Sequence, residues 1–337
     1  MTSPVHLEPF TDEPRHLEAA RTGDPELGPF QLLPGTWANV PGLPGRGWNM
    51  IALPFSPPPG VGGPPFRLLV NQYNEELKFQ LVDKKIPNRG INPADPANGD
   101  QRIIALDYEQ AISQIAADDF PQSGLAGDPD LAIHHEPGLL LNMADQTFPG
   151  EPTIARLATI PHGDAVLAMG NPSVLNGPPV IPTVNALPVG VSQDLDSRYL
   201  AAYKHFHDNL FRGLFDPTDP TALLKAANEG VNIVRTTVLE FDSTVERGGI
   251  NNIPFIVRQA NASEMKATFF IQEIENEDGT NRLRLQYVQD VLLDFFPRTD
   301  GGPGRIKWPH VSINTMEKVS DVVDTSSYAR MPGQDTL

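Results

Sequence analysis

The sequence predicts a mainly β protein, an antiparallel up-and-down β-barrel of about ten strands with one helical insertion. Stretches in which apolar and polar residues alternate recur along most of the chain. They are punctuated by turns, as the 35 prolines and 28 glycines indicate. No strand–helix–strand alternation runs through the chain, which disfavours a parallel α/β architecture. A long antiparallel sheet must protect its edges, and barrel closure does so, although a β-sandwich is a competing solution.

The first half of the chain carries alternating stretches after a polar segment, residues 1–32, that we expect to pack outside the barrel as an arm. The candidate strands here are residues 48–55, 66–73, 77–82, 102–116, 131–143 and 153–169. The polar triplet at 74–76 predicts a hairpin between the second and third stretches. Residues 102–116 are a mixed stretch that allows a strand followed by a bend or short helix, and the pattern does not resolve it.

Residues 171–230 interrupt the strand pattern. Apolar residues at helical spacing predict a helix over 195–214, and residues 220–228 predict a second, shorter helix. This insertion could cover the barrel mouth as a lid or pack on an outer apolar patch. Strands are expected again at residues 232–243, 255–259, 264–275, 283–295 and 310–319. The expected organisation is therefore the arm, a barrel domain over 33–319 and a polar tail over 320–337.

Composition excludes several classes of function. The formal net charge of -17 disfavours nucleic acid and anionic membranes as partners. The chain has no cysteine, so disulfides, thiolate nucleophiles and cysteine metal sites are excluded. The N-terminus does not resemble a signal peptide, and no apolar run reaches the roughly 20 residues that span a bilayer. We therefore expect a cytoplasmic protein.

Histidine is the main candidate for chemistry, since the chain has eight histidines and no cysteine. His134 and His135 are adjacent in an apolar stretch, so alternation sends them to opposite faces of a strand, and Glu136 shares the face of His134. A bend at Pro137, with its polar groups satisfied at a sheet edge, explains the same residues. Both interpretations stay open at this point.

The other histidines have simpler explanations. His162 lies in a Pro-His-Gly-Asp turn, which is typical of an exposed hairpin histidine. His205 and His207 are two residues apart on the predicted helix, so they do not share a face as a zinc pair would. His310 follows a Trp-Pro pair at the start of the closing strand, where it could cap the strand or reach the barrel cavity.

Four short motifs occur in order along the predicted barrel. They are Gly35-Thr36-Trp37 before a glycine-rich segment, Ile133-His134-His135-Glu136, Pro161-His162-Gly163-Asp164, and His310 on the last strand. In this order they resemble the motifs of nitrobindin-like haem-binding β-barrels, which are related to fatty-acid-binding proteins and lipocalins. The resemblance covers residues 33–170 and 232–319, and it does not cover the arm, the insertion or the tail.

The resemblance implies a haem b cofactor with His310 as the proximal iron ligand. It also implies that four further residues bind the cofactor: Thr36, Trp37, His134 and His135. The implied activity is peroxidase-like, isomerase or nitrogen-oxide chemistry on a small-molecule ligand. His134, His135 or His162 would supply a polar group on the other side of the haem, and the resemblance does not choose among them. By charge alone, a propionate could pair with Arg46, Arg67 or Arg156.

Two alternatives remain at this stage. The barrel could carry an apolar small molecule without catalysis, with His310 only structural. A site of histidine and glutamate side chains could instead hold a non-haem metal.

Overall fold

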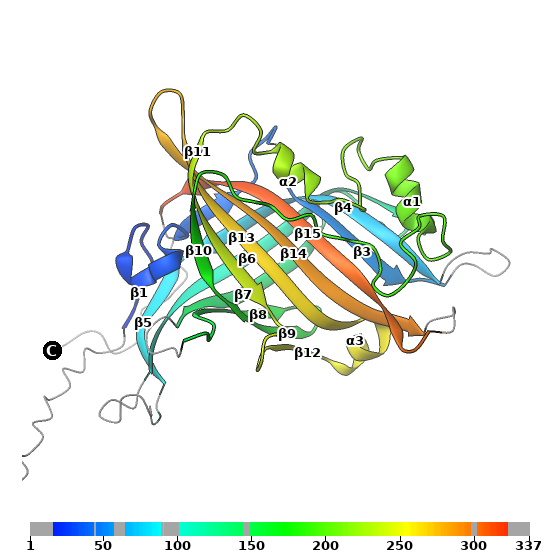
Figure 1. Cartoon of the computed structure of the whole chain (residues 1–337), viewed down its shortest axis with the longest axis horizontal. Coiled ribbons are helices and arrows are strands. Elements are labelled where there is room, and N and C mark those ends of the chain that lie inside the picture. Colours follow the sequence, from blue (N-terminus) through cyan, green and yellow to red (C-terminus); the bar gives the residue numbers. More distant parts are fainter. Residues whose placement is uncertain are drawn as a thin grey trace, which may run out of the picture.

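The computed structural model describes residues 16–43, 45–56, 65–88, 90, 101–143, 149–297 and 302–322. They form a closed antiparallel barrel of ten strands, as the sequence predicts (Figure 1). Fifteen strands lie in the described residues, and some of them share one position in the ring or extend the sheet beyond it: β1 His16–Ala19, β2 Gly35–Ala38, β3 Trp48–Pro54, β4 Phe66–Phe79, β5 Leu81–Asn88, β6 Gln101–Phe120, β7 Ala132–Asn142, β8 Ile154–Ile160, β9 Asp164–Gly170, β10 Pro172–Asn176, β11 Ile233–Asp242, β12 Gly249–Asn252, β13 Asn261–Glu275, β14 Asn281–Pro297 and β15 Arg305–Ser320. Its helices are the 3-10 helix η1 Pro25–Phe30, α1 Ala201–Asp208, α2 Ala222–Ala226 and α3 Pro254–Gln259.

The barrel is an up-and-down meander that closes on itself. The order around the ring is β2 or β3, then β4, β6, β7, β8, β9, β11, β13, β14 and β15, and the ring closes because β15 pairs with both β2 and β3. The short strands β1, β10 and β12 extend the sheet beside β5, β11 and β9. Closure leaves no long unpaired edge around the ring.

Two local predictions were wrong, and one stretch that the sequence left unresolved is a strand. Residues 66–82 are not a hairpin, because β4 runs unbroken through the polar triplet, where β6 pairs with Asn74 and Glu75. The ambiguous stretch at 102–116 is part of the single 20-residue strand β6. Residues 255–259 are helical, since Pro254 at the first position favours the start of a helix, α3.

Packed side chains close one end of the barrel. Of the segment expected to pack outside as an arm, residues 16–32 are described, and Leu27 and Phe30 of η1 are buried there against the barrel core. Trp37 is fully buried beside them, and its indole Nε1 donates to the carbonyl of Leu33 at 2.8 Å. The inward-facing side chains near this end, such as Met316, are also fully buried.

The other end is filled less evenly. Leu293 and Trp308, on the inward face of β14 and β15, are buried there, whereas Ile51, Leu69 and Val291 on the inner wall keep some accessible surface. We call this end, beside the first half of β15, the open end.

The insertion, residues 171–230, packs against the outside of the barrel (Figure 1). Phe215 stacks on Trp48 at a ring distance of 5.4 Å, and Tyr203 and Phe206 of α1 join the same apolar cluster with the outward-facing Ile313. The helices are shorter than predicted, because Leu210 and Leu214 fall outside α1 and remain exposed. The insertion therefore covers part of the outer surface of the barrel.

Polar side chains of the wall also hold the insertion. Arg284 Nη1 donates to the carbonyl of Ala227 at 2.7 Å, and Gln286 Nε2 donates to the carbonyl of Leu224 at 3.0 Å. These carbonyls lie at the C-terminal end of α2, where helix carbonyls lack partners within the helix.

No helix in the described part of the chain is long and apolar enough for a membrane span.

Candidate functional site

His310 faces the barrel interior. Arg156 on β8 reaches Gln289 on β14, a strand that is not its neighbour, so both side chains must cross the inside of the barrel. Side chains two residues apart on a strand share a face, so Val291 also points inward. His310 is the cross-strand partner of Val291 and shares that face.

The imidazole of His310 has no partner on one nitrogen. Its Nε2 is enclosed and accepts or donates no hydrogen bond among the described residues. The residue keeps some accessible surface, whereas Nε2 itself is enclosed. Burial, with a smaller contribution from His134 and His162, lowers the pKa of His310 to about 3. The ring is therefore neutral at physiological pH, as a metal ligand has to be.

His134 and His162 lie at the same end of the barrel as His310. Their rings are 5.9 Å apart, and both influence His310 electrostatically from the far side of the interior. His162 sits exposed in the β8–β9 hairpin, as its turn chemistry predicts. His135 points outside, where its Nε2 lies 2.9 Å from Glu109 Oε1. The structure thus brings three histidines to one end and leaves His135 out.

Glu136 contacts the ring of His134 and is itself bound by Arg156. His134 Nε2 lies 3.3 Å from Glu136 Oε2, while Arg156 Nη2 and Tyr108 OH donate to Glu136 Oε1 at 2.6 and 2.5 Å. Burial opposes ionisation of this carboxyl, but the Arg156 charge and hydrogen bonds from His134 and Tyr108 outweigh it and lower the pKa of Glu136 to about 2. Glu136 is therefore a permanent anion behind His134.

A second polar network crosses the barrel nearer its middle. Glu75 on β4 accepts from Tyr287 OH at 2.6 Å, from Asn314 Nδ2 at 2.8 Å and from Gln110 Nε2 at 2.7 Å. Burial raises the pKa of Glu75, although these hydrogen bonds oppose the rise. Tyr73 OH lies 2.8 Å from Tyr287 OH and completes the network. Sequence reasoning missed it, since the alternation of β4 was broken by the assumed turn at Glu75.

Thr36 and Trp37 lie far from His310. Trp37 pairs with Lys318 on β15, eight residues after His310, which is roughly 26 Å along a strand. Thr36 and Trp37 belong to the closed end, and His310 belongs to the open end. The structure does not bring these predicted cofactor residues together.

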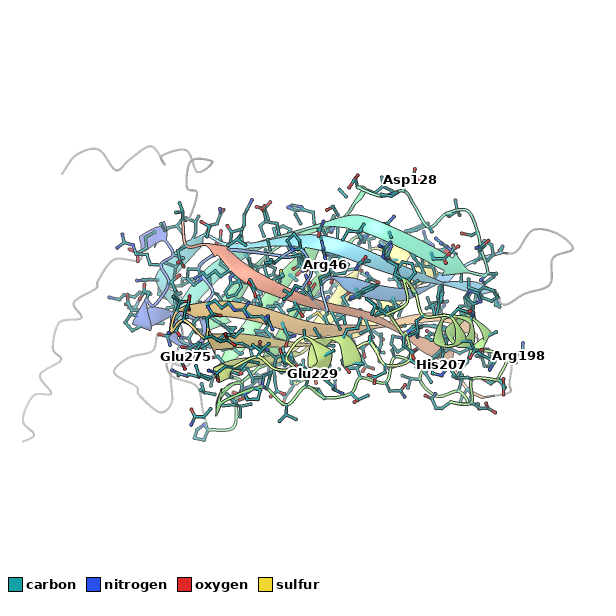
Figure 2. All side chains as sticks on the ribbon, turned by 90° about the horizontal axis from the view of Figure 1, so that it is seen from above. Arg46, Asp128, Arg198, His207, Glu229 and Glu275 are labelled. Carbon is teal, nitrogen blue, oxygen red and sulfur yellow. The ribbon has the colours of Figure 1, made fainter. Side chains whose placement is uncertain are left out.

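The three arginines considered for a propionate and the two histidines of the insertion contact other residues of the protein. Arg67 pairs with Asp119, and Arg156 is engaged with Glu136, Tyr108 and Gln289. Arg46 donates to Asn74. On the insertion, His207 Nδ1 lies 2.8 Å from Asp216 Oδ2, and Figure 2 shows this histidine at the opposite end of the molecule from Glu275. His205 stacks on Phe120 outside the barrel, with ring centroids 4.1 Å apart.

The open end is not a preassembled metal site. Within the described ranges, no three histidine or acidic side chains are grouped closely enough to hold an ion. Comparison with family models, with curated proteins and with solved structures finds no match to this chain. The fold and the side chains at this end are therefore the basis for a functional assignment.

Proposed function

We propose that the chain binds haem at the open end of the barrel, with His310 as the axial ligand of the iron. The observation that carries the proposal is the enclosed Nε2 of His310, an inward-facing polar atom without a partner. A buried polar atom without a hydrogen bond costs about 1–3 kcal/mol, so such atoms point to a missing ligand or water. The closed ten-stranded barrel is compatible with a calycin-like fold.

The residues present fit an iron porphyrin in two further respects. His310 stays unprotonated at neutral pH, so no proton competes with the metal for its lone pair. Apolar side chains with accessible surface, among them Ile51, Leu69 and Val291, line the same end and suit a porphyrin face. Bound haem supplies an iron centre for small oxygen or nitrogen ligands, and the polar groups around it select among them.

His134 is the polar group that we assign to the other side of this space. It faces inward, its ring is backed by the ionised carboxylate of Glu136, and it lies across the interior from His310. A carboxylate behind an imidazole fixes its tautomer and stabilises a proton on it. His134 can therefore hold or deliver a proton to a small ligand, which supports peroxidase-like, isomerase or nitrogen-oxide chemistry. His135 is on the wrong face for this role.

Because neighbouring atoms enclose Nε2, iron can reach it only when side chains at this end move. The partly exposed Ile51 and Val291 lie on the inward face at this end, so we infer that they are among the side chains that move. Haem uptake should accordingly be slower than simple diffusion into an open pocket.

A second candidate function is transport of an apolar small molecule in the same space. The partly exposed apolar residues of the inner wall favour it, and they do not require His310. The two candidates differ in the effect of one substitution. Only haem binding through iron should depend on an imidazole at position 310.

An absorbance titration with haemin tests the proposal. We expect the wild-type chain to give a Soret band that saturates at one haem per chain, and His310→Ala to shift or lose that band. His135→Ala is the matched control, since it removes an outward-facing imidazole, and its titration should match the wild type. A band that is the same in His310→Ala would remove His310 as the ligand, and bound lipid without any Soret band would favour the carrier function.

A further inference from the structure

Asp164 and Asn252 form a side-by-side pair on the inner wall of the open end. They are cross-strand partners of β9 and β12, so their side chains project from the same face. The next pair along the same face, Val166 and Ile250, contributes to the packed interior of the barrel. The pair therefore points into the barrel near its mouth. Asn251, which lies between Ile250 and Asn252 on β12, points outside.

Each member of the pair presents an acceptor oxygen without a donor. Asn252 Nδ2 donates to the carbonyl of Ala262 at 2.8 Å, which fixes the orientation of the amide and leaves Oδ1 facing away. Oδ1 of Asn252 and Oδ1 of Asp164 are both enclosed and have no hydrogen-bond partner among the described residues. Two adjacent acceptors without a donor make a site for a group that carries at least two N–H or O–H bonds.

The backbone beside the pair is closely packed. A hydrogen bond from the amide of Ile253 to the carbonyl of Gly163, at 3.0 Å, links the β8–β9 turn to the end of β12. Gly163 has a φ of +111°, and a Cβ there would lie 2.6 Å from the Ile253 side chain. This close approach supports the pairing that sets Asp164 beside Asn252.

The charge of the site favours a cation. No lysine or arginine in the described part of the chain forms an ion pair with Asp164, and burial raises the pKa of its carboxyl, with His162 only partly opposing the rise. A bound cation would restore the ionised form. The net charge of -17 also concentrates cations near the protein.

The geometry points to a subsite for a primary ammonium group, which donates one N–H to Asp164 Oδ1 and another to Asn252 Oδ1. An ammonium has three donors and no acceptor, so it matches an aspartate–amide pair better than a carboxylate or a carbonyl does. His162 is exposed and interacts electrostatically with Asp164, so it lies near the proposed subsite. This subsite shares the open end with the proposed haem but does not use His310.

Two aromatic probes of similar size test the inference, 1-naphthylmethylammonium and 1-naphthoate. Binding is followed by isothermal calorimetry at low ionic strength, with EDTA present, in the full chain. We expect the ammonium probe to bind at least about tenfold more tightly than the carboxylate, the order expected of one charge-assisted contact. Asp164→Asn should abolish most of this preference, and Asn252→Leu should reduce it, because leucine has a similar shape and no acceptor oxygen.

The control is Asn251→Leu, which makes the same change on the outer face of the same strand and should leave the preference unchanged. Equal binding of both probes by the wild type would overturn the inference and leave a water as the occupant of the pair. An equal loss of preference in Asn252→Leu and Asn251→Leu would also overturn it, since the effect would then not depend on the inward-facing acceptor. Haemin titration of the same samples separates the two proposals: haem uptake without an ammonium preference defeats only the subsite, and the reverse result defeats only haem binding.

Discussion

Arg156 on β8 donates a hydrogen bond from Nη1 to Gln289 Oε1 on β14, 2.7 Å away across the barrel interior. The same guanidinium holds Glu136, which in turn lies beneath His134. One buried cation thus connects a wall residue near His310 with the carboxylate that supports His134. The polar part of the open end is built on this connection.

Replacement of Arg156 by methionine should destabilise the fold strongly. The substitution leaves the fully buried Glu136 without its counter-ion, and loss of one member of a buried pair typically costs about 3–5 kcal/mol. The measurement is chemical denaturation of Arg156→Met against wild type. The double variant Glu136→Gln/Arg156→Met should lose less than the sum of the two single changes, and strict additivity would show that the pair is not coupled.

His310 should make the fold sensitive to acid. Its pKa is lowered to about 3 by burial, whereas an unfolded chain has a histidine pKa near 6.5. Between these values the unfolded chain takes up a proton that the folded chain refuses, so stability is present above pH 6.5 and is lost as the pH falls. From pH 7 to pH 5 this one group should remove about 2 kcal/mol.

His310→Gln isolates that contribution, because glutamine does not titrate. Its unfolding free energy should fall by about 2 kcal/mol less than that of wild type over the same pH interval. Parallel curves for the two proteins would mean that the imidazole is not buried from solvent. Glu136 does not confuse the comparison, since its lowered pKa places its own stability loss below about pH 4.5 in both proteins.

Trp37 should matter for stability and not for haem. Trp37→Phe removes the hydrogen bond to Leu33 and leaves a small void in the closed end, which should cost about 1–3 kcal/mol. Haem affinity should not change, because this end lies roughly 26 Å from His310 along β15. Denaturation and haemin titration of the same variant measure both effects. A large drop in haem affinity with unchanged stability would return Trp37 to the cofactor site.

The docking of the insertion depends on a few aromatic contacts. Phe215→Ala removes the ring stacked on Trp48 and should destabilise the protein by about 3–5 kcal/mol. Leu214→Ala is the matched control, because Leu214 is 58% exposed and its loss should cost less than about 0.5 kcal/mol. Equal effects of the two substitutions, measured by thermal unfolding, would show that the insertion is not held on the barrel wall by this stack.

Periodicity was enough to predict the class of fold. The alternation of β14 and β15, with one apolar face, predicted a meander of strands that could close, and the structure confirms a closed barrel. The alternation of residues 131–143 also separated His134 from His135 correctly. Alternation depends only on the local backbone, so a single sequence shows it well.

What alternation could not show is how distant strands share polar groups. Glu75 looked like part of a turn because it is charged, yet Gln110, Tyr287 and Asn314 satisfy it inside the barrel. Charge alone makes Arg156 one of three candidate partners for a haem propionate, but Glu136 and Gln289 already bind its guanidinium. These partners lie far apart in sequence, so no local pattern indicates them. The same limit applies to Asp164 and Asn252, whose pairing appears only once β9 and β12 are in register.

The most direct test of haem binding through His310 is resonance Raman spectroscopy of the ferrous haem-loaded protein. We predict an iron–histidine stretching band in the wild type, its loss in His310→Gly, and its return when imidazole is added to that variant, because free imidazole can occupy the space of the missing ring. An unchanged iron–histidine band in His310→Gly without imidazole would show that another histidine holds the iron, and would contradict the account.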